Sequence, residues 1–74
     1  MAHLEYRPFI SIVIPVYNEE AILRAAVVDL VDQLSALPWS YELVLAEIGS
    51  TDRTVAVAAE LAGRFGQLVC LLYV

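Results

Sequence analysis

Two short polar segments carry the side chains of this sequence that are able to bind a ligand. The first segment, residues 15–19, provides a tyrosine ring, an amide and a carboxylate. The second segment, residues 47–52, provides a carboxylate at each end and two hydroxyl groups between them. A few polar groups beside an aromatic ring are typical of a small-molecule site. The candidate site residues are Tyr17, Asn18, Glu19, Glu47 and Asp52.

An apolar strand is expected directly before the first segment. Residues 9–14 are almost entirely apolar and rich in β-branched side chains, which predicts a strand buried on both faces by helices. Pro15 has no N–H to donate, so we expect it to end the hydrogen-bond ladder. Asn18 is placed to cap a helix, with Glu19 and Glu20 in the first turn, where carboxylates complement the helix dipole.

The rest of the chain repeats this alternation of strand and helix. The further elements that we expect are a helix over 19–37, a strand over 41–48, a helix over 52–65 and a strand over 67–74. Ser50 or Thr51 is expected to cap the second helix, with Asp52 in its opening turn. Capping explains these three residues adequately. Glu47, by contrast, has no evident local structural duty at the end of a strand, which favours a role in the site.

The order strand, helix, strand, helix, strand predicts an α/β fold with a three-stranded parallel sheet and right-handed crossovers. This is half of a doubly wound domain. The carboxyl ends of adjacent parallel strands lie at one edge, so residues 15–19 and 47–52 are expected within reach of one ligand.

The chemistry of the first turn limits the kind of ligand. A dinucleotide-binding turn needs the pattern G-x-G-x-x-G, and residues 15–20 contain no glycine. Glu19 and Glu20 stand where the helix begins and would repel a phosphate group. A bound nucleotide is therefore expected to present its base and ribose here, with its phosphates handled elsewhere.

Composition restricts the partners and the compartment. The chain has 74 residues and a formal net charge of −5, which argues against a nucleic-acid partner. A single cysteine suits a reducing compartment, so we expect a cytoplasmic location, or the cytosolic face of a membrane for a membrane-associated full-length protein. The apolar run 68–74 is too short to span a bilayer. Because 61% of the residues are hydrophobic, we expect this run to be covered by a second copy or by further chain.

The two segments together resemble the start of a glycosyltransferase family 2 enzyme. The chain reads SIVIPVYNEE and, some thirty residues later, GSTDRT. The family pattern runs strand, P-x-Y-N-E, helix, strand, D-D-G-S-x-D, helix. The resemblance implies a three-layer β-α-β-α-β half of a Rossmann-like GT-A domain over residues 9–74, after a lead-in over 1–8. It further implies nucleotide-sugar binding, with Pro15, Tyr17 and Glu19 lining the base and ribose pocket.

Two departures from the family pattern bear on activity. The aspartate pair is replaced by Glu47 and Ile48, and Ile48 cannot accept a hydrogen bond from a base. Loss of a charge-assisted hydrogen bond costs about 1.5–3 kcal/mol. The metal-binding D-x-D and the catalytic base of an inverting-type transferase are absent from these 74 residues. We therefore expect no catalytic or metal residue here, and a divalent cation (manganese or magnesium) only in a full-length relative.

Two other functions remain open from the sequence. The chain is alternatively a non-catalytic remnant of the fold that acts as an oligomerising or assembly module, which agrees with the isoleucine at position 48. A third interpretation is an unrelated small α/β module whose motifs are only capping patterns. Binding of a nucleoside diphosphate distinguishes the first interpretation from the second.

Overall fold

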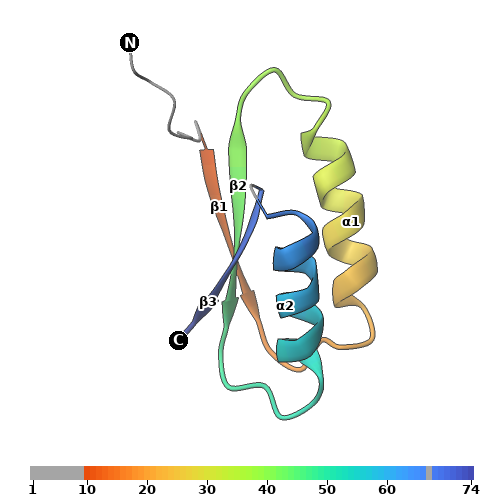
Figure 1. The fold of residues 1–74 in the computed structure, drawn as a ribbon, viewed down its shortest axis with the longest axis vertical. Helices are drawn as coiled ribbons and strands as arrows, with labels where there is room; N and C mark the ends of the chain where they lie inside the picture. The colour runs from red at the N-terminus through yellow and green to blue at the C-terminus, as the bar shows by residue number, and fades with distance from the viewer. Residues whose placement is uncertain (1–9, 67) are drawn as a thin grey trace.

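The computed structural model describes residues 10–66 and 68–74 (Figure 1). The expected lead-in over 1–8 and the predicted strand residues Phe9 and Gln67 lie outside the described residues. The elements are β1 Ile10–Val16, α1 Leu23–Leu34, β2 Tyr41–Glu47, α2 Thr54–Arg64 and β3 Val69–Tyr73.

The three strands form one parallel sheet in the order β1-β2-β3, as the sequence predicts. Leu43 in the central strand pairs with Ile12 of β1 and with Val69 of β3. This register places the ends of β1 and β2 side by side, with Val16 opposite Glu47. Residues 17–22 and 48–53 therefore leave the sheet at the same edge.

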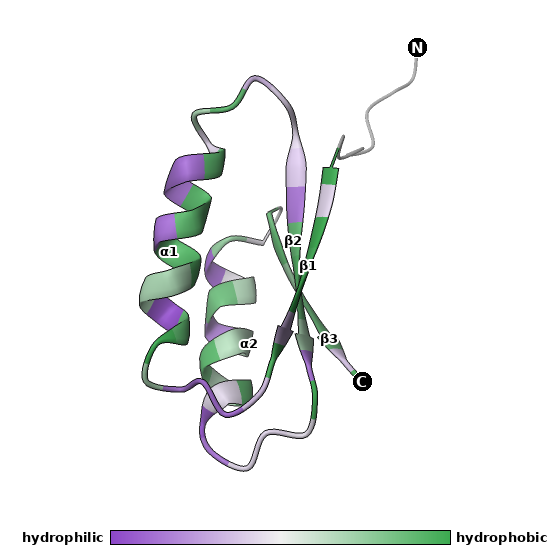
Figure 2. Cartoon of the chain, turned by 180° about the vertical axis from the view of Figure 1, so that it is seen from behind, coloured by the Kyte–Doolittle hydropathy of each residue, from purple (hydrophilic) through white to green (hydrophobic). Residues whose placement is uncertain are grey.

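Both helices lie on one face of the sheet (Figures 1 and 2). The strand order steps twice in the same direction, and two right-handed crossovers of that kind place both helices on the same side. The expected three layers are therefore corrected to two for the described residues. Neither of the two helices combines the length and the apolar character that a bilayer crossing requires.

The core lies between this helical layer and the sheet. Leu43 and Leu45 of β2 and Leu61 of α2 are completely buried. Helix α1 contributes a stripe with helical spacing, in which Leu23 and Val27 are almost fully buried. The central strand and the two helices thus supply most of the apolar packing.

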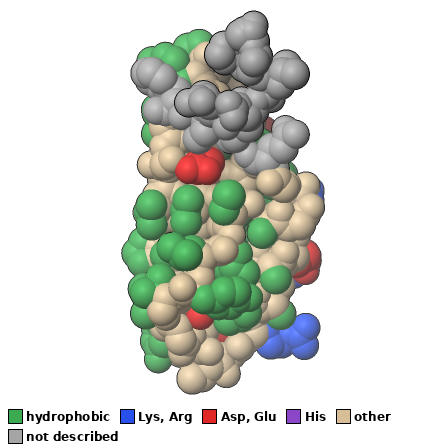
Figure 3. Space-filling view, turned by 60° about the vertical axis from the view of Figure 1, so that its left-hand side comes forward, with side chains coloured by type: hydrophobic (Ala, Val, Ile, Leu, Met, Phe, Trp, Pro, Cys, Tyr) green, Lys and Arg blue, Asp and Glu red, His purple; other side chains and the backbone are tan. Residues whose placement is uncertain are grey.

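The opposite face of the sheet is uncovered in the described part of the chain, and Figure 3 shows hydrophobic side chains gathered there. Val13 of β1 is 60% exposed and Leu72 of β3 is 51% exposed. Cys70, also on β3, is exposed as well. The prediction that the first strand is buried on both faces is therefore wrong for these residues, because only one face of the sheet carries helices.

Most element boundaries differ by one to four residues from the sequence-based expectation, and hydrogen bonds explain two of these differences. Strand β1 continues through Pro15 to Val16. The carbonyl of Val16 faces β2, because it accepts from the N–H of Ile48. The backbone nitrogen of the preceding Pro15 therefore faces the outer edge of the sheet, where its lack of an N–H breaks no bond to β2. Helix α1 begins four residues later than predicted. The carbonyl of Glu19 accepts from the N–H of Leu23 and so forms a turn ahead of the helix.

Because the core lies on one side of the sheet, side-chain truncation should affect stability differently on the two faces. We expect Leu45→Ala to lower the free energy of unfolding by about 2–5 kcal/mol, because it opens a cavity in the core. Val13→Ala, on the exposed face, is the matched control and should change it by less than about 0.5 kcal/mol. Urea titrations followed by circular dichroism measure both. Equal effects of the two substitutions would contradict the one-sided core.

Candidate functional site

The β1–α1 and β2–α2 loops are joined by hydrogen bonds at the carboxyl edge of the sheet. The backbone N–H of Asn18 donates to the hydroxyl oxygen of Ser50 over 2.9 Å. The side-chain carbonyl of Asn18 accepts from the N–H of Thr51 over 2.8 Å. Asn18 has a φ of 47°, in the left-handed region that asparagine tolerates. Asn18 therefore links the two loops and does not cap α1, which has no side-chain cap.

The two glutamates of the first loop extend this link to the start of α2. The N–H of Glu19 donates to the hydroxyl oxygen of Thr54 over 2.8 Å, and Thr54 is completely buried. The carboxylate of Glu20 accepts from the N–H of Arg53 over 3.1 Å. The first loop is thus bonded to successive residues at the N-terminus of α2.

The carboxylate of Asp52 accepts hydrogen bonds at the N-terminus of α2. Its side chain accepts from the N–H of Thr54 over 2.8 Å and also from the hydroxyl of Thr54. It accepts a longer bond from the N–H of Glu20 at 3.4 Å. The hydroxyl of Thr54 is the main reason that the pKa of Asp52 lies below its usual value. The prediction that Ser50 or Thr51 caps this helix is therefore wrong.

Glu47 has a local structural duty that the sequence did not reveal. Its side chain is 97% buried, and its carboxylate accepts from the N–H of Gly49 over 3.0 Å and of Ser50 over 2.8 Å. Gly49 turns the chain with a φ of 69°, a conformation that favours glycine. The hydroxyl of Ser50, followed by these N–H groups, lowers the pKa of Glu47 against the opposing effect of burial.

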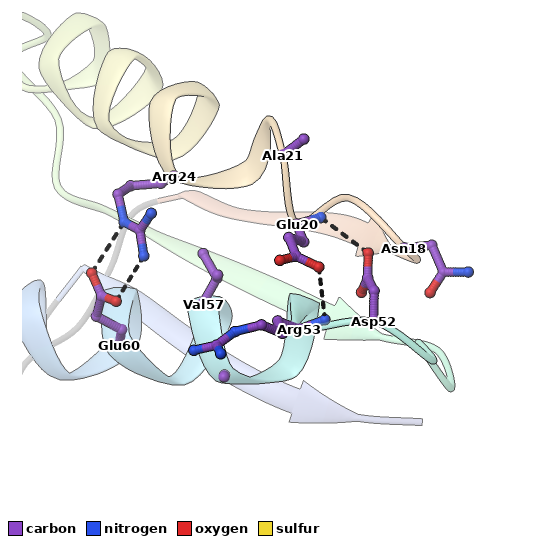
Figure 4. Close-up of a pocket in the computed structure, with 9 residues that line it drawn as sticks. Asn18, Glu20, Ala21, Arg24, Asp52, Arg53, Val57 and Glu60 are labelled. Atoms are coloured by element: carbon purple, nitrogen blue, oxygen red, sulfur yellow. Dashed lines mark hydrogen bonds and ion pairs between the residues drawn. The ribbon is translucent and has the colours of Figure 1, made fainter.

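A cavity of about 650 Å³ opens between the first turns of the two helices (Figure 4). Its walls combine three carboxylates, two guanidinium groups and a short apolar floor. The lining residues are Asn18, Glu20, Ala21, Arg24, Asp52, Arg53, Ala56, Val57 and Glu60. Charges of both signs therefore face one space, which suits a polar ligand with both donors and acceptors.

Arg24 and Glu60 close one end of this cavity, where Figure 4 shows them facing each other. Glu20 and Arg24 have the spacing of an ion pair within one helix, but Glu20 lies ahead of α1. Instead, two guanidinium nitrogens of Arg24 donate to the two carboxylate oxygens of Glu60 on α2, over 3.1 and 2.8 Å. This contact lowers the pKa of Glu60 and raises that of Arg24. Because it joins residues 36 positions apart, no local pattern in the sequence could indicate it.

The structure does not bring all of the sequence-predicted site residues to one place. Asn18 and Asp52 line the cavity between the helices. Glu19, half-buried, and Glu47, buried under its own turn, are not among the lining residues.

Pro15 and Tyr17 lie elsewhere. Pro15 is exposed on the uncovered face of the sheet, in register with Ala46. Tyr17 follows at the end of β1 and is 54% exposed, and Ile48 at the end of β2 is 46% exposed. The two ends are adjacent, because the N–H of Ile48 donates to the carbonyl of Val16. Among the described residues, no group of three or more His, Cys, Asp and Glu side chains could hold a metal ion.

The left-handed conformation of Asn18 allows the effect of its side-chain hydrogen bonds on stability to be separated from the effect of its backbone conformation. We expect Asn18→Gly to lower the free energy of unfolding by about 1 kcal/mol, because only the hydrogen bonds of the side chain are lost. Asn18→Ala should cost about 2 kcal/mol, because alanine also resists a positive φ. Urea titrations measure both values. An alanine variant as stable as the glycine variant would contradict the conformational role.

The lowered pKa of Glu47 predicts a stability that depends on pH. The carboxylate stabilises the fold above its ordinary pKa of about 4.5, and this stabilisation is lost as the pH falls through the lower folded-state value. Glu47→Gln should therefore lower the Tm at neutral pH, and the difference should shrink in acid. Asp32→Asn, on the exposed side of α1, is the control that should leave the Tm unchanged at each pH. A difference that stays constant with pH would exclude this role for the carboxylate.

Known proteins that are similar to this chain include curated bacterial transferases. Undecaprenyl-phosphate 4-deoxy-4-formamido-L-arabinose transferase from Edwardsiella ictaluri is 38% identical over 61 residues, 82% of this chain and 19% of that protein. The protein of the same name from Shewanella sediminis is 42% identical over 64 residues, 81% of this chain and 19% of the relative. Dodecaprenyl-phosphate galacturonate synthase from Rhizobium johnstonii is 35% identical over 57 residues, 77% of this chain and 17% of the relative.

This chain spans less than a fifth of the length of these relatives. No solved structure matched it. The model of the family described as glycosyl transferase family 2 matches residues 11–73. That region runs from β1 to β3 and includes both interlocked loops, and the predicted resemblance is thereby confirmed: this chain belongs to glycosyl transferase family 2.

Proposed function

We propose that this chain is the nucleotide-sugar-binding front of a glycosyltransferase and that it binds the nucleoside at the ends of β1 and β2. The observation that carries the proposal is the exposure of Tyr17 and Ile48 at adjacent strand ends, above loops that hydrogen bonds hold in place. An exposed tyrosine ring next to an apolar side chain offers a flat surface on which a base can stack. Ligands of open parallel sheets bind at this carboxyl edge.

The names of the relatives support a class of substrate. Each is named as a transferase or synthase that acts on a prenyl phosphate, with a substituted arabinose or galacturonate as the sugar. By analogy, the proposed donor is a nucleotide sugar and the proposed acceptor is a prenyl phosphate at the cytosolic face of a membrane. The described residues hold no cluster suited to a metal, so the proposal assigns no metal-dependent step to them. Transfer by these 74 residues alone is not expected.

Position 48 decides how strongly the base is held. In the family pattern this position carries a carboxylate that accepts a hydrogen bond from the base, and here it is isoleucine. Glu47 does not replace it, since its oxygens already accept two N–H groups on the helical side of the sheet. The site therefore binds the base through stacking and apolar contact alone. This interaction is weak and discriminates little between bases.

Titration calorimetry with UDP and GDP in the presence of EDTA tests the proposal without a contribution from metal. We expect weak binding of both nucleotides by the chain, and weaker binding by Tyr17→Ala. Ile48→Asp should tighten binding of UDP by roughly tenfold to a hundredfold, the effect of one restored charge-assisted hydrogen bond. Ile22→Asp makes the same change at another exposed isoleucine, outside the proposed site, and should leave the affinity unaltered.

The alternative function, a non-catalytic assembly module, is favoured by the same isoleucine. Failure of both the parent chain and Ile48→Asp to bind either nucleotide would overturn the proposed nucleoside site and leave this alternative. Equal tightening of nucleotide binding by Ile22→Asp and Ile48→Asp would also overturn the proposed nucleoside site, since a general effect of the added charge would then explain the result.

A further inference from the structure

The outer edge of β3 offers backbone groups for pairing with another strand. The N–H of Leu43 donates to the carbonyl of Leu68, and the N–H of Val74 donates to the carbonyl of Glu47. Even-numbered residues of this segment thus face β2, and alternation along the strand turns the backbone groups of residues 71 and 73 outward. Across residues 10–66 and 68–74, β3 pairs with β2 alone.

This edge lacks the features by which proteins usually block strand addition. Charged side chains, proline and bulges protect edge strands from pairing with other chains. The other outer edge of the sheet, on β1, carries Pro15 without an N–H. Strand β3 reads VCLLY and contains neither a charge nor a proline. Of the two outer edges, that of β3 is therefore the one without a proline.

Helix α2 extends this uncharged surface into the second layer. It packs against α1 and against β3. Ala56 and Glu60 face the cavity beside α1, so the side of the helix away from α1 carries Val55, Ala59 and Ala62. These three are half-buried or exposed, small and uncharged. Together with β3 they form one surface, which we call the β3–α2 surface.

The β3–α2 surface can pair with a copy of itself, because both its strand edge and its helix flank are uncharged. A net charge of −5 on each copy opposes association elsewhere, so contact between two copies is confined to this surface. In a two-fold arrangement the β3 edges pair in antiparallel fashion and the two α2 helices come side by side. Neighbouring strands lie about 4.8 Å apart and packed helices about 8–10 Å apart, so helices set between the second and third strands match that spacing. We propose that two copies of this chain associate through the β3–α2 surface and form a continuous six-stranded sheet.

The size of the surface sets the strength of this association. A strand of five residues is about 17 Å long, and one helix flank adds a similar length. The contact is smaller than the roughly 1,600 Å² of a standard stable interface, so the dimer dissociates at low concentration. This inference goes beyond the proposed nucleoside site and does not depend on it.

Sedimentation velocity of the 74-residue chain from about 10 μM to about 1 mM tests the proposal, with circular dichroism to verify folding. We expect the dimer fraction to rise across this range. Ala59→Glu places a charge in the contact and should raise the dimer dissociation constant at least about tenfold. Ala25→Glu, on the exposed side of α1, adds the same charge elsewhere and should leave the dissociation constant unchanged.

A second pair of variants separates the edge of the sheet from its uncovered face. Tyr73→Pro removes an outward N–H without removing a bond to β2, and it should also abolish the dimer; it replaces Ala59→Glu if that variant does not fold. Val13→Lys changes the uncovered face far from β3 and should leave the dimer intact. A chain that stays monomeric throughout the concentration range overturns the proposal. So does a dimer that survives both Ala59→Glu and Tyr73→Pro, and so does a dimer that dissociates only in the Val13→Lys variant.

Discussion

The buried carboxylate of Glu47 determines the geometry of the carboxyl edge. Its two oxygens accept the N–H groups of Gly49 and Ser50 directly after β2, which gives the following turn one shape. That shape presents the hydroxyl of Ser50 and the N–H of Thr51 to Asn18 in the neighbouring loop. Without the carboxylate, the partly buried N–H groups of Gly49 and Ser50 would lose their acceptors, which is costly in a small domain. The positions of both motif loops therefore depend on a side chain that faces away from the proposed ligand.

The placement of both helices on one face leaves many of the apolar side chains of this chain uncovered. A chain with 61% hydrophobic residues needs two covered sheet faces, and in the described residues only one is covered. The consequence appears in individual side chains: Val13 and Leu72 are more than half exposed although both lie in strands. A contiguous apolar strand face of this kind is typical of a surface that another segment or chain covers.

The sequence was sufficient for features that depend on local periodicity. The parallel sheet, the two helices and the family resemblance follow from apolar spacing and from two motifs, and the structure and the comparisons confirm them. The partners of the motif residues could not be predicted in this way. Asn18 has the residue type of a helix cap, and only the tertiary fold brings Ser50, 32 positions away, within reach of its backbone. Likewise, a glutamate at a strand end gives no sign in the sequence that it will accept two bonds from its own turn.

The one-directional strand order also has a consequence for how a ligand is enclosed. In open α/β sheets a crevice arises where neighbouring crossovers turn to opposite faces, at a topological switch point. The order β1-β2-β3 contains no such reversal among the described residues, so the ends of β1 and β2 provide only one wall. An opposing wall has to come from outside the described residues, on the free side of β1. Tyr17 stands at that border, and a ligand stacked on its ring would become enclosed only when the second wall is in place.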